Sequence, residues 1–177
     1  SIPSGGRAIR LEPIDRGMSN AERLRAFLTD ADEITILCHN NPDPACLASA
    51  LALVRIAATV GVDDRHLLYS GTISHHQNRA LVNLLDLDLR PFDEATVRDR
   101  PPDALLAFVD HSLPGQNNDV SPDTPVDVVI DHHPAEGIDA RFVDHRVKVG
   151  ATATILTEYV RDLDVDVGTE LGTALLF

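Results

Sequence analysis

Lysine is nearly absent from this sequence: Lys148 stands beside fourteen arginines, while acidic residues, mostly aspartates, bring the formal net charge to −13. A carboxylate-rich, lysine-poor surface is typical of proteins from salt-loving archaea, because such a surface stays hydrated at very high salt. An ordinary acidic cytosolic protein leaves the scarcity of lysine unexplained, so we expect a halophilic archaeal source. Phosphates usually bind Lys and Arg, so an acidic surface normally disfavours a nucleic-acid partner. At about 1 M salt, however, the Debye length is only ~3 Å, so a distant acidic surface repels a phosphate little. The acidity therefore does not exclude a nucleic-acid partner.

Cysteine is also scarce, and long apolar runs are missing. Cys38 and Cys46 are the only two cysteines, which excludes a disulfide-rich framework and favours buried free thiols in a reduced, cytoplasmic protein. Zinc bound through this pair is disfavoured because no second Cys/His pair has the usual spacing. No stretch is long and apolar enough to span a membrane, and no signal-peptide pattern is present. We therefore expect a cytoplasmic protein without a membrane partner.

Three short apolar runs are present, and each is typical of a buried strand. They cover residues 34–38, 104–109 and 126–130 and alternate with segments of helical pattern. Such alternation predicts an α/β fold in which helices flank a parallel sheet. At 177 residues the chain is long enough for one domain with a substantial core. Further expected elements are a helix capped by Ser19, a buried helix over 46–60, a helix over 78–85 and an edge strand at 142–143.

His and Asp residues follow each of the three runs directly. The first run is followed by His39 and Asp43, the second by Asp110, and the third by Asp131, His132 and His133. The carboxyl ends of parallel strands meet at one sheet edge, where ligands bind in open α/β folds. Carboxylates and imidazoles there suit a divalent metal or proton transfer. A single cluster is also explained as a polar turn or helix cap, but three together favour a shared site. His111 is expected either to line this site or to face solvent.

This ordered set of motifs resembles that of the DHH phosphoesterase family, which includes RecJ-type exonucleases, oligoribonucleases, cyclic-dinucleotide phosphodiesterases and family II pyrophosphatases. The family's first motif is His-x-x-Pro-Asp-x-Asp followed by small residues and a Ser, and residues 39–49 read His-Asn-Asn-Pro-Asp-Pro-Ala-Cys-Leu-Ala-Ser. The second motif is a strand-terminal Asp, matched by Asp110, and the third is the Asp-His-His of residues 131–133. Gly-Ala-Thr-Ala-Thr at 150–154 resembles the stretch that follows. The resemblance runs from about residue 33 onward.

The resemblance implies two Mn²⁺ ions at the sheet edge, with Asp110 shared between them. The first ion would bind His39, Asp43 and Asp110, and the second would bind the residue at position 45, Asp110, His132 and an aspartate of a fourth motif. The implied catalytic residues are His133, which would contact the phosphate, and Asp131, which would orient the imidazoles. Two ions placed in this way clamp a phosphoryl oxygen and activate a water between them.

Two departures from the family pattern limit this expectation. Ala45 stands where the family has a metal-binding Asp, either as an engineered inactivating substitution or as a natural degeneration. The sequence also ends at Phe177 inside an apolar helix pattern, so we expect the fourth motif and the C-terminal substrate-binding domain to be absent. We assign residues 1–18 to a linker or N-terminal extension and residues 19–177 to a C-terminally incomplete DHH domain. Such a chain would hold at most one weakly bound Mn²⁺.

The function that these patterns favour is that of a manganese-dependent phosphodiesterase acting on short oligonucleotides or nucleotides through a metal-activated water. The long segment between Asp43 and Asp110 favours the nuclease and oligoribonuclease branch. A pyrophosphatase is an alternative that differs in substrate rather than in mechanism. Another alternative, which Ala45 keeps open, is a catalytically degenerate nucleotide-sensing module attached to an upstream regulatory domain. The sequence leaves the oligomeric state open.

Overall fold

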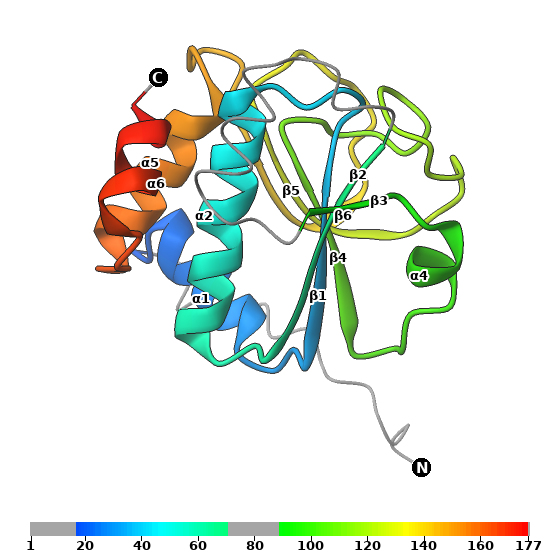
Figure 1. Ribbon diagram of the computed structural model, residues 1–177, viewed down its shortest axis with the longest axis horizontal. Helices are drawn as coiled ribbons and strands as arrows, with labels where there is room; N and C mark the ends of the chain where they lie inside the picture. The colour runs from blue at the N-terminus through cyan, green and yellow to red at the C-terminus, as the bar shows by residue number, and fades with distance from the viewer. Residues whose placement is uncertain (1–16, 71–88, 177) are drawn as a thin grey trace.

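The computed structural model describes residues 17–70 and 89–176. Six strands form one parallel sheet in the order β3-β2-β1-β4-β5-β6 (Figure 1). The strands are β1 (Glu33–Cys38), β2 (Asp64–Tyr69), β3 (Leu89–Pro91), β4 (Ala104–Val109), β5 (Val126–Asp131) and β6 (Ala140–His145). The predicted α/β fold with a parallel sheet is therefore confirmed, and the strand expected at 142–143 belongs to the edge strand β6.

Among the described residues, the helices cover the two faces of the sheet unequally. They are α1 (Asn20–Leu28), α2 (Pro44–Val60), α4 (Glu94–Arg98), α5 (Thr152–Asp162) and α6 (Gly168–Leu175). Four of them lie on one face, and the short α4 lies on the other (Figure 1). Because successive strand residues point to opposite faces, Ile36 and Ala107 pack under the four helices, whereas Leu37 and Phe108 pack on the side of α4. The sheet thus separates two apolar layers.

Helix α2 is buried because its sequence is apolar on nearly every side, as residues 46–60 predicted. Asp43 caps its N-terminus by accepting a hydrogen bond from the Cys46 amide at 2.8 Å, and Pro44 lies in its first turn. Gly61 ends the helix with a φ of +96°, a left-handed conformation that a β-carbon would strain. These signals fix the start of α2 beside the end of β1.

A buried aspartate interrupts the apolar run of β5. Asp127 Oδ2 accepts a hydrogen bond from the Leu106 amide of β4 at 2.8 Å, just before the first residue pair of the β4–β5 register. Arg100 and Arg141 lie 3.7 and 3.5 Å from the same carboxylate. The side chain therefore takes the place of a backbone carbonyl and keeps the Leu106 donor paired.

Replacing Asp127 by Ala is expected to destabilise the domain by about 2–3 kcal/mol, because the buried Leu106 amide loses its acceptor and Arg100 and Arg141 each lose a carboxylate nearby. Urea unfolding followed by circular dichroism measures this change. The control is Asp123→Ala, which removes the same charge at an exposed turn position and should change stability by less than ~0.5 kcal/mol. Equal effects of the two substitutions would contradict the proposed role of Asp127.

Two predictions concern residues that the structure does not describe: most of the linker or extension at 1–18, and the whole helix at 78–85. Within the described ranges, α1 begins at the predicted cap, where Ser19 Oγ accepts a hydrogen bond from the Glu22 amide at 3.1 Å. No helix among the described residues combines the length and apolarity that crossing a membrane demands.

Candidate metal centre

The ends of β1 and β4 form a topological switch point. These strands are neighbours in the sheet, and the chain builds the sheet outward in opposite directions from them. Open α/β sheets bind ligands at such points, beyond the carboxyl ends of the strands. His39 follows β1 and Asp110 follows β4, and His39 Nε2 lies 3.1 Å from Asp110 Oδ2. Both residues are less than one-tenth exposed.

His39 and Asp110 stabilise each other in the charged form. Burial alone would lower the pKa of His39, but its hydrogen bond to Asp110 and its contact with Cys46 raise it to about 11. Burial likewise opposes ionisation of Asp110, yet hydrogen bonds from His39 and Thr152 hold the pKa of this carboxyl below its usual value. The same imidazole nitrogen and carboxylate oxygens are atoms of the kind that hold divalent cations.

Asp110 is the residue that the other site groups share. Its backbone is left-handed, with a φ of +69°, and its Oδ1 accepts a hydrogen bond from Thr152 Oγ1 at 2.7 Å. His132 Nε2 and His133 Nδ1 lie 3.7 and 3.8 Å from the same oxygen. Two groups of potential ligand atoms, each within 4.8 Å, therefore meet at this carboxylate. The first group consists of His39, Cys46 and Asp110, and the second consists of Asp110, His132 and His133.

The two imidazoles whose Nε2 atoms face Asp110 are held in the orientation that a metal ligand requires. His39 Nδ1 donates to the Asn40 carbonyl at 2.8 Å, and His132 Nδ1 donates to the Val149 carbonyl at 3.1 Å. Because a carbonyl oxygen only accepts, each Nδ1 carries a proton, and Nε2 is the atom turned towards the carboxylate. Metal-ligating histidines are commonly fixed by such an outer hydrogen bond. The donor set therefore fits a divalent cation.

Asp131, the last residue of β5, fixes the loop that carries the two histidines. It is 1% exposed, and its Oδ1 accepts from the His132 and His133 amides at 2.8 and 3.2 Å and from His133 Nδ1 at 2.7 Å. Its Oδ2 accepts from Ser112 Oγ at 2.6 Å. His145 Nε2 donates to the His133 carbonyl at 2.5 Å. The ring of His133 is thus oriented while remaining about half exposed at the sheet edge.

The structure brings three of the four predicted metal ligands together, and Asp43 is the exception. Asp43 is exposed, and its Oδ1 is engaged in capping α2, so its metal contact stays a prediction. Ala45 is half-buried and offers no donor atom. The next residue, Cys46, contributes its sulfur to the group that contains His39. Burial raises the pKa of the Cys46 thiol.

His111 is buried, which corrects the interpretation that it faces solvent, and its ring packs edge-on against that of His39 with centroids 6.4 Å apart. Its Nε2 donates to the Leu37 carbonyl at 2.7 Å, and its Nδ1 accepts from Asn118 Nδ2 at 2.9 Å. The ring stacks on Phe108 with centroids 4.3 Å apart. Burial lowers the pKa of His111 to about 4, so the ring is neutral. His111 therefore links the loop after β4 to Leu37 of β1, which is seventy-four residues away in sequence.

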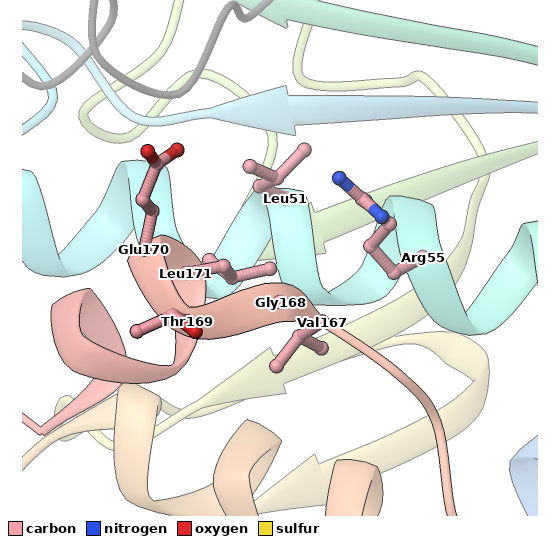
Figure 2. Close-up of a pocket in the computed structure, with 7 residues that line it drawn as sticks. All are labelled: Leu51, Arg55, Val167, Gly168, Thr169, Glu170 and Leu171. Atoms are coloured by element: carbon pink, nitrogen blue, oxygen red, sulfur yellow. The ribbon is translucent and has the colours of Figure 1, made fainter.

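A surface pocket of about 300 Å³ lies between α2 and the start of α6 (Figure 2). Leu51 and Arg55 of α2 form one wall, and residues 167–171 at the start of α6 form the other. None of the predicted site residues lines this pocket, and its walls come from helices rather than from strand ends. The candidate site is therefore the sheet edge.

The switch point and the shared aspartate define an α/β protein with a candidate centre for divalent cations beyond its strand ends. Residues 33–176 match the N-terminal domain of the DHH family. This match covers most of the chain, and the chain belongs to the DHH family. The resemblance indicated by the ordered motifs is thereby confirmed.

Proteins similar to this chain extend well beyond it. An uncharacterized protein of Methanocaldococcus jannaschii is 38% identical over 144 residues, which cover 81% of this chain and 29% of that protein. An exopolyphosphatase-related protein from Bacteroides fragilis has a TM-score of 0.60 at 13% identity, over 89% of this chain and 48% of the other. A putative family II inorganic pyrophosphatase from Methanococcus jannaschii has a TM-score of 0.55 at 19% identity, over 81% and 46%. The two structures support the fold alone, and the chain spans less than half of each of these proteins.

Proposed function

We propose that this domain belongs to a metal-dependent phosphodiesterase that hydrolyses phosphate esters of short oligonucleotides or nucleotides, with Mn²⁺ as the family cation. The observation that carries the proposal is the position of Asp110. This buried carboxylate lies close to the imidazole of His39, which follows β1, and to the imidazoles of His132 and His133, which follow β5. A shared carboxylate of this kind suits two cations that act on one phosphoryl group. Membership in the DHH family supports phosphoester or pyrophosphate-type hydrolysis as the chemical class.

Each site residue has a distinct part in this proposal. His39 and His132 would hold cations on opposite sides of the shared carboxylate of Asp110, through the Nε2 atoms that their outer hydrogen bonds leave available. The cations would supply Lewis acidity and lower the pKa of a bound water. His133 is half exposed, and Asp131 occupies its Nδ1. Its other ring nitrogen is therefore available to donate a hydrogen bond to a phosphate oxygen.

A nucleotide-sensing module without hydrolytic activity is the second candidate, and Ala45 favours it. Position 45 offers no ligand atom where the family pattern has an Asp. Among the described residues, Asp110 and His132 would then be the only predicted ligands on that side of the centre. Such a module would bind a nucleotide phosphate through His133 without hydrolysing it.

Replacing Ala45 by Asp is expected to strengthen Mn²⁺ binding by at least about 10-fold, the lower end of what outer partners of metal ligands contribute. The added carboxylate supplies both a ligand oxygen and a negative charge beside the centre. Titration calorimetry compares the native chain with the substituted one. The control is Ala45→Asn, which adds a side chain of the same size without the charge and should give a smaller gain. Equal affinity in all three chains would contradict a metal site at this position.

A hydrolysis assay with Mn²⁺ separates the two candidate functions. The native chain and the Ala45→Asp chain are each given a short oligonucleotide, a dinucleotide and pyrophosphate. We expect little hydrolysis by the native chain and preferential cleavage of the oligonucleotide or dinucleotide by the substituted chain. Cleavage of pyrophosphate alone would favour a pyrophosphatase. Nucleotide binding without any hydrolysis would favour the sensing module.

A further inference from the structure

The side chain of Cys46 lies inside the candidate centre, although the proposed function gives it no role. Its sulfur, a ring nitrogen of His39 and a carboxylate oxygen of Asp110 lie within 4.8 Å of one another. The thiol also donates a hydrogen bond to the Val109 carbonyl at 3.7 Å, one residue before Asp110. The exposed fractions are 8% for His39, 0% for Cys46 and 7% for Asp110. The ends of β1 and β4 and the first turn of α2 thus bring three buried ligand atoms into one group.

The surroundings of Cys46 differ from those of an ordinary buried thiol, which packs as a small apolar group. Its sulfur faces an imidazole and a carboxylate as well as the apolar core. Cys38 provides the contrast within the same chain. It is equally buried and contacts Cys46, but it does not belong to the group formed with His39 and Asp110. Both are free cysteines, as the sequence predicted.

The charge of the centre also favours Cys46 as a metal ligand. In the group that contains His39, Asp110 is the only carboxylate, and a thiolate at Cys46 would add a second negative charge. A coordinating thiol gives up its proton to the cation. A set of imidazole, thiolate and carboxylate is softer than the imidazole and carboxylate set that suits Mn²⁺. Three protein ligands with a remaining open position are the usual arrangement of Zn²⁺ in catalytic sites.

We propose that Cys46 is a metal ligand in this chain and that it makes the position beside His39 selective for Zn²⁺, or its analogue Co²⁺, over Mn²⁺. This inference rests on the proposed function, because it concerns the same centre, but it changes the cation that the native chain binds. It does not involve a Cys38–Cys46 zinc pair, which the sequence disfavours. The second and third ligands come from His39 and Asp110, at the ends of two neighbouring strands.

Titration of the metal-free 177-residue chain with Co²⁺ under reducing conditions tests this assignment. A thiolate ligand gives Co²⁺ an intense sulfur-to-metal charge-transfer absorption in the near ultraviolet, whereas imidazole and carboxylate ligands do not. We expect the native chain to develop this absorption and to lose it when Zn²⁺ is added. Cys46→Ser and Cys46→Ala should lack the absorption, and Cys38→Ser should retain it. Circular dichroism identifies the variants that fold, and the two differently sized substitutions at position 46 guard against a folding failure.

The selectivity is measured by direct titration with Zn²⁺ and with Mn²⁺. We expect the native preference for Zn²⁺ to fall in Cys46→Ser by about 10-fold or more, since even outer partners of metal ligands contribute 10–100-fold. An unchanged preference would overturn the selectivity. Absence of the absorption in the native chain, its survival in both Cys46 variants, or its loss in Cys38→Ser would overturn the ligand assignment. If Co²⁺ still binds without the absorption and Asp110→Asn abolishes that binding, the centre of the proposed function stands and the role of Cys46 alone fails.

Discussion

Replacing Asp110 by Asn is expected to remove cation binding from the domain while leaving its fold intact. The carboxylate belongs to both groups of potential ligand atoms, so its loss takes a ligand and a negative charge from both sides at once. Loss of an outer partner alone typically costs 10–100-fold in metal affinity, and for this shared ligand we expect a fall of about 100-fold or more. Titration calorimetry with Mn²⁺ and with Zn²⁺ measures the change.

Asn suits position 110 because of the backbone there. The φ of +69° is a conformation that Asn tolerates better than Ala does. An Asn Oδ1 can still accept the hydrogen bond that Thr152 Oγ1 now donates at 2.7 Å, and its amide can donate to His39 Nε2. These hydrogen bonds should keep the variant folded, but the charged pair with His39 is lost, so we expect the free energy of unfolding to fall by up to about 3 kcal/mol.

A matched control separates the loss of a ligand from the loss of a charge. Asp123→Asn removes one negative charge from an exposed turn, and it should leave the affinity for both cations unchanged. The contrary result is equally clear. If Asp110→Asn bound both cations as tightly as the native chain does, Asp110 would not be a ligand, and the candidate centre would have to be abandoned.

The sequence could predict those features of the molecule that depend on local pattern and on topology. The apolar runs at 34–38, 104–109 and 126–130 are β1, β4 and β5. The polar residues that follow them meet because parallel strands direct their carboxyl ends to the same edge of the sheet. A rule of topology was therefore enough to bring His39 and Asp110 together, without any knowledge of distances.

The features that could not be predicted depend on strand register and helix phase. Asp127 looked like one member of an apolar run, because its partner, the Leu106 amide, lies on the neighbouring strand. His111 donates to a carbonyl of β1 that only the folded sheet brings near. Successive residues of a helix point about 100° apart, and the phase of α2 places the Cys46 sulfur beside His39. The family pattern predicted a metal ligand at position 45, whereas in the structure the sulfur of the next residue, Cys46, lies with His39 and Asp110.

Replacing Asp131 by Asn is expected to slow hydrolysis by about 10–100-fold without lowering stability, because Asp131 acts on the site through His133. An Asn Oδ1 can accept the three hydrogen bonds that the His132 and His133 amides and His133 Nδ1 now donate. Its amide can donate to Ser112 Oγ, which is a donor in the native chain. The loop therefore keeps its shape, and only the negative charge beside the His133 ring is lost. The measurement is kcat and KM in the Ala45→Asp chain with a short oligonucleotide.

Asp131→Ala separates this charge effect from a structural one. At a site that is 1% exposed, Ala leaves several donors without an acceptor, so we expect a loss of stability of about 3 kcal/mol together with lost activity. Ser112→Ala removes only the partner of Oδ2 and should cost about 1 kcal/mol with activity close to that of its parent. A fall in kcat for Asp131→Asn at unchanged stability would show that the charge on Asp131 supports His133 during the reaction. Full activity in Asp131→Asn would show instead that hydrogen bonds alone position the ring, and that the carboxylate serves the fold of the loop.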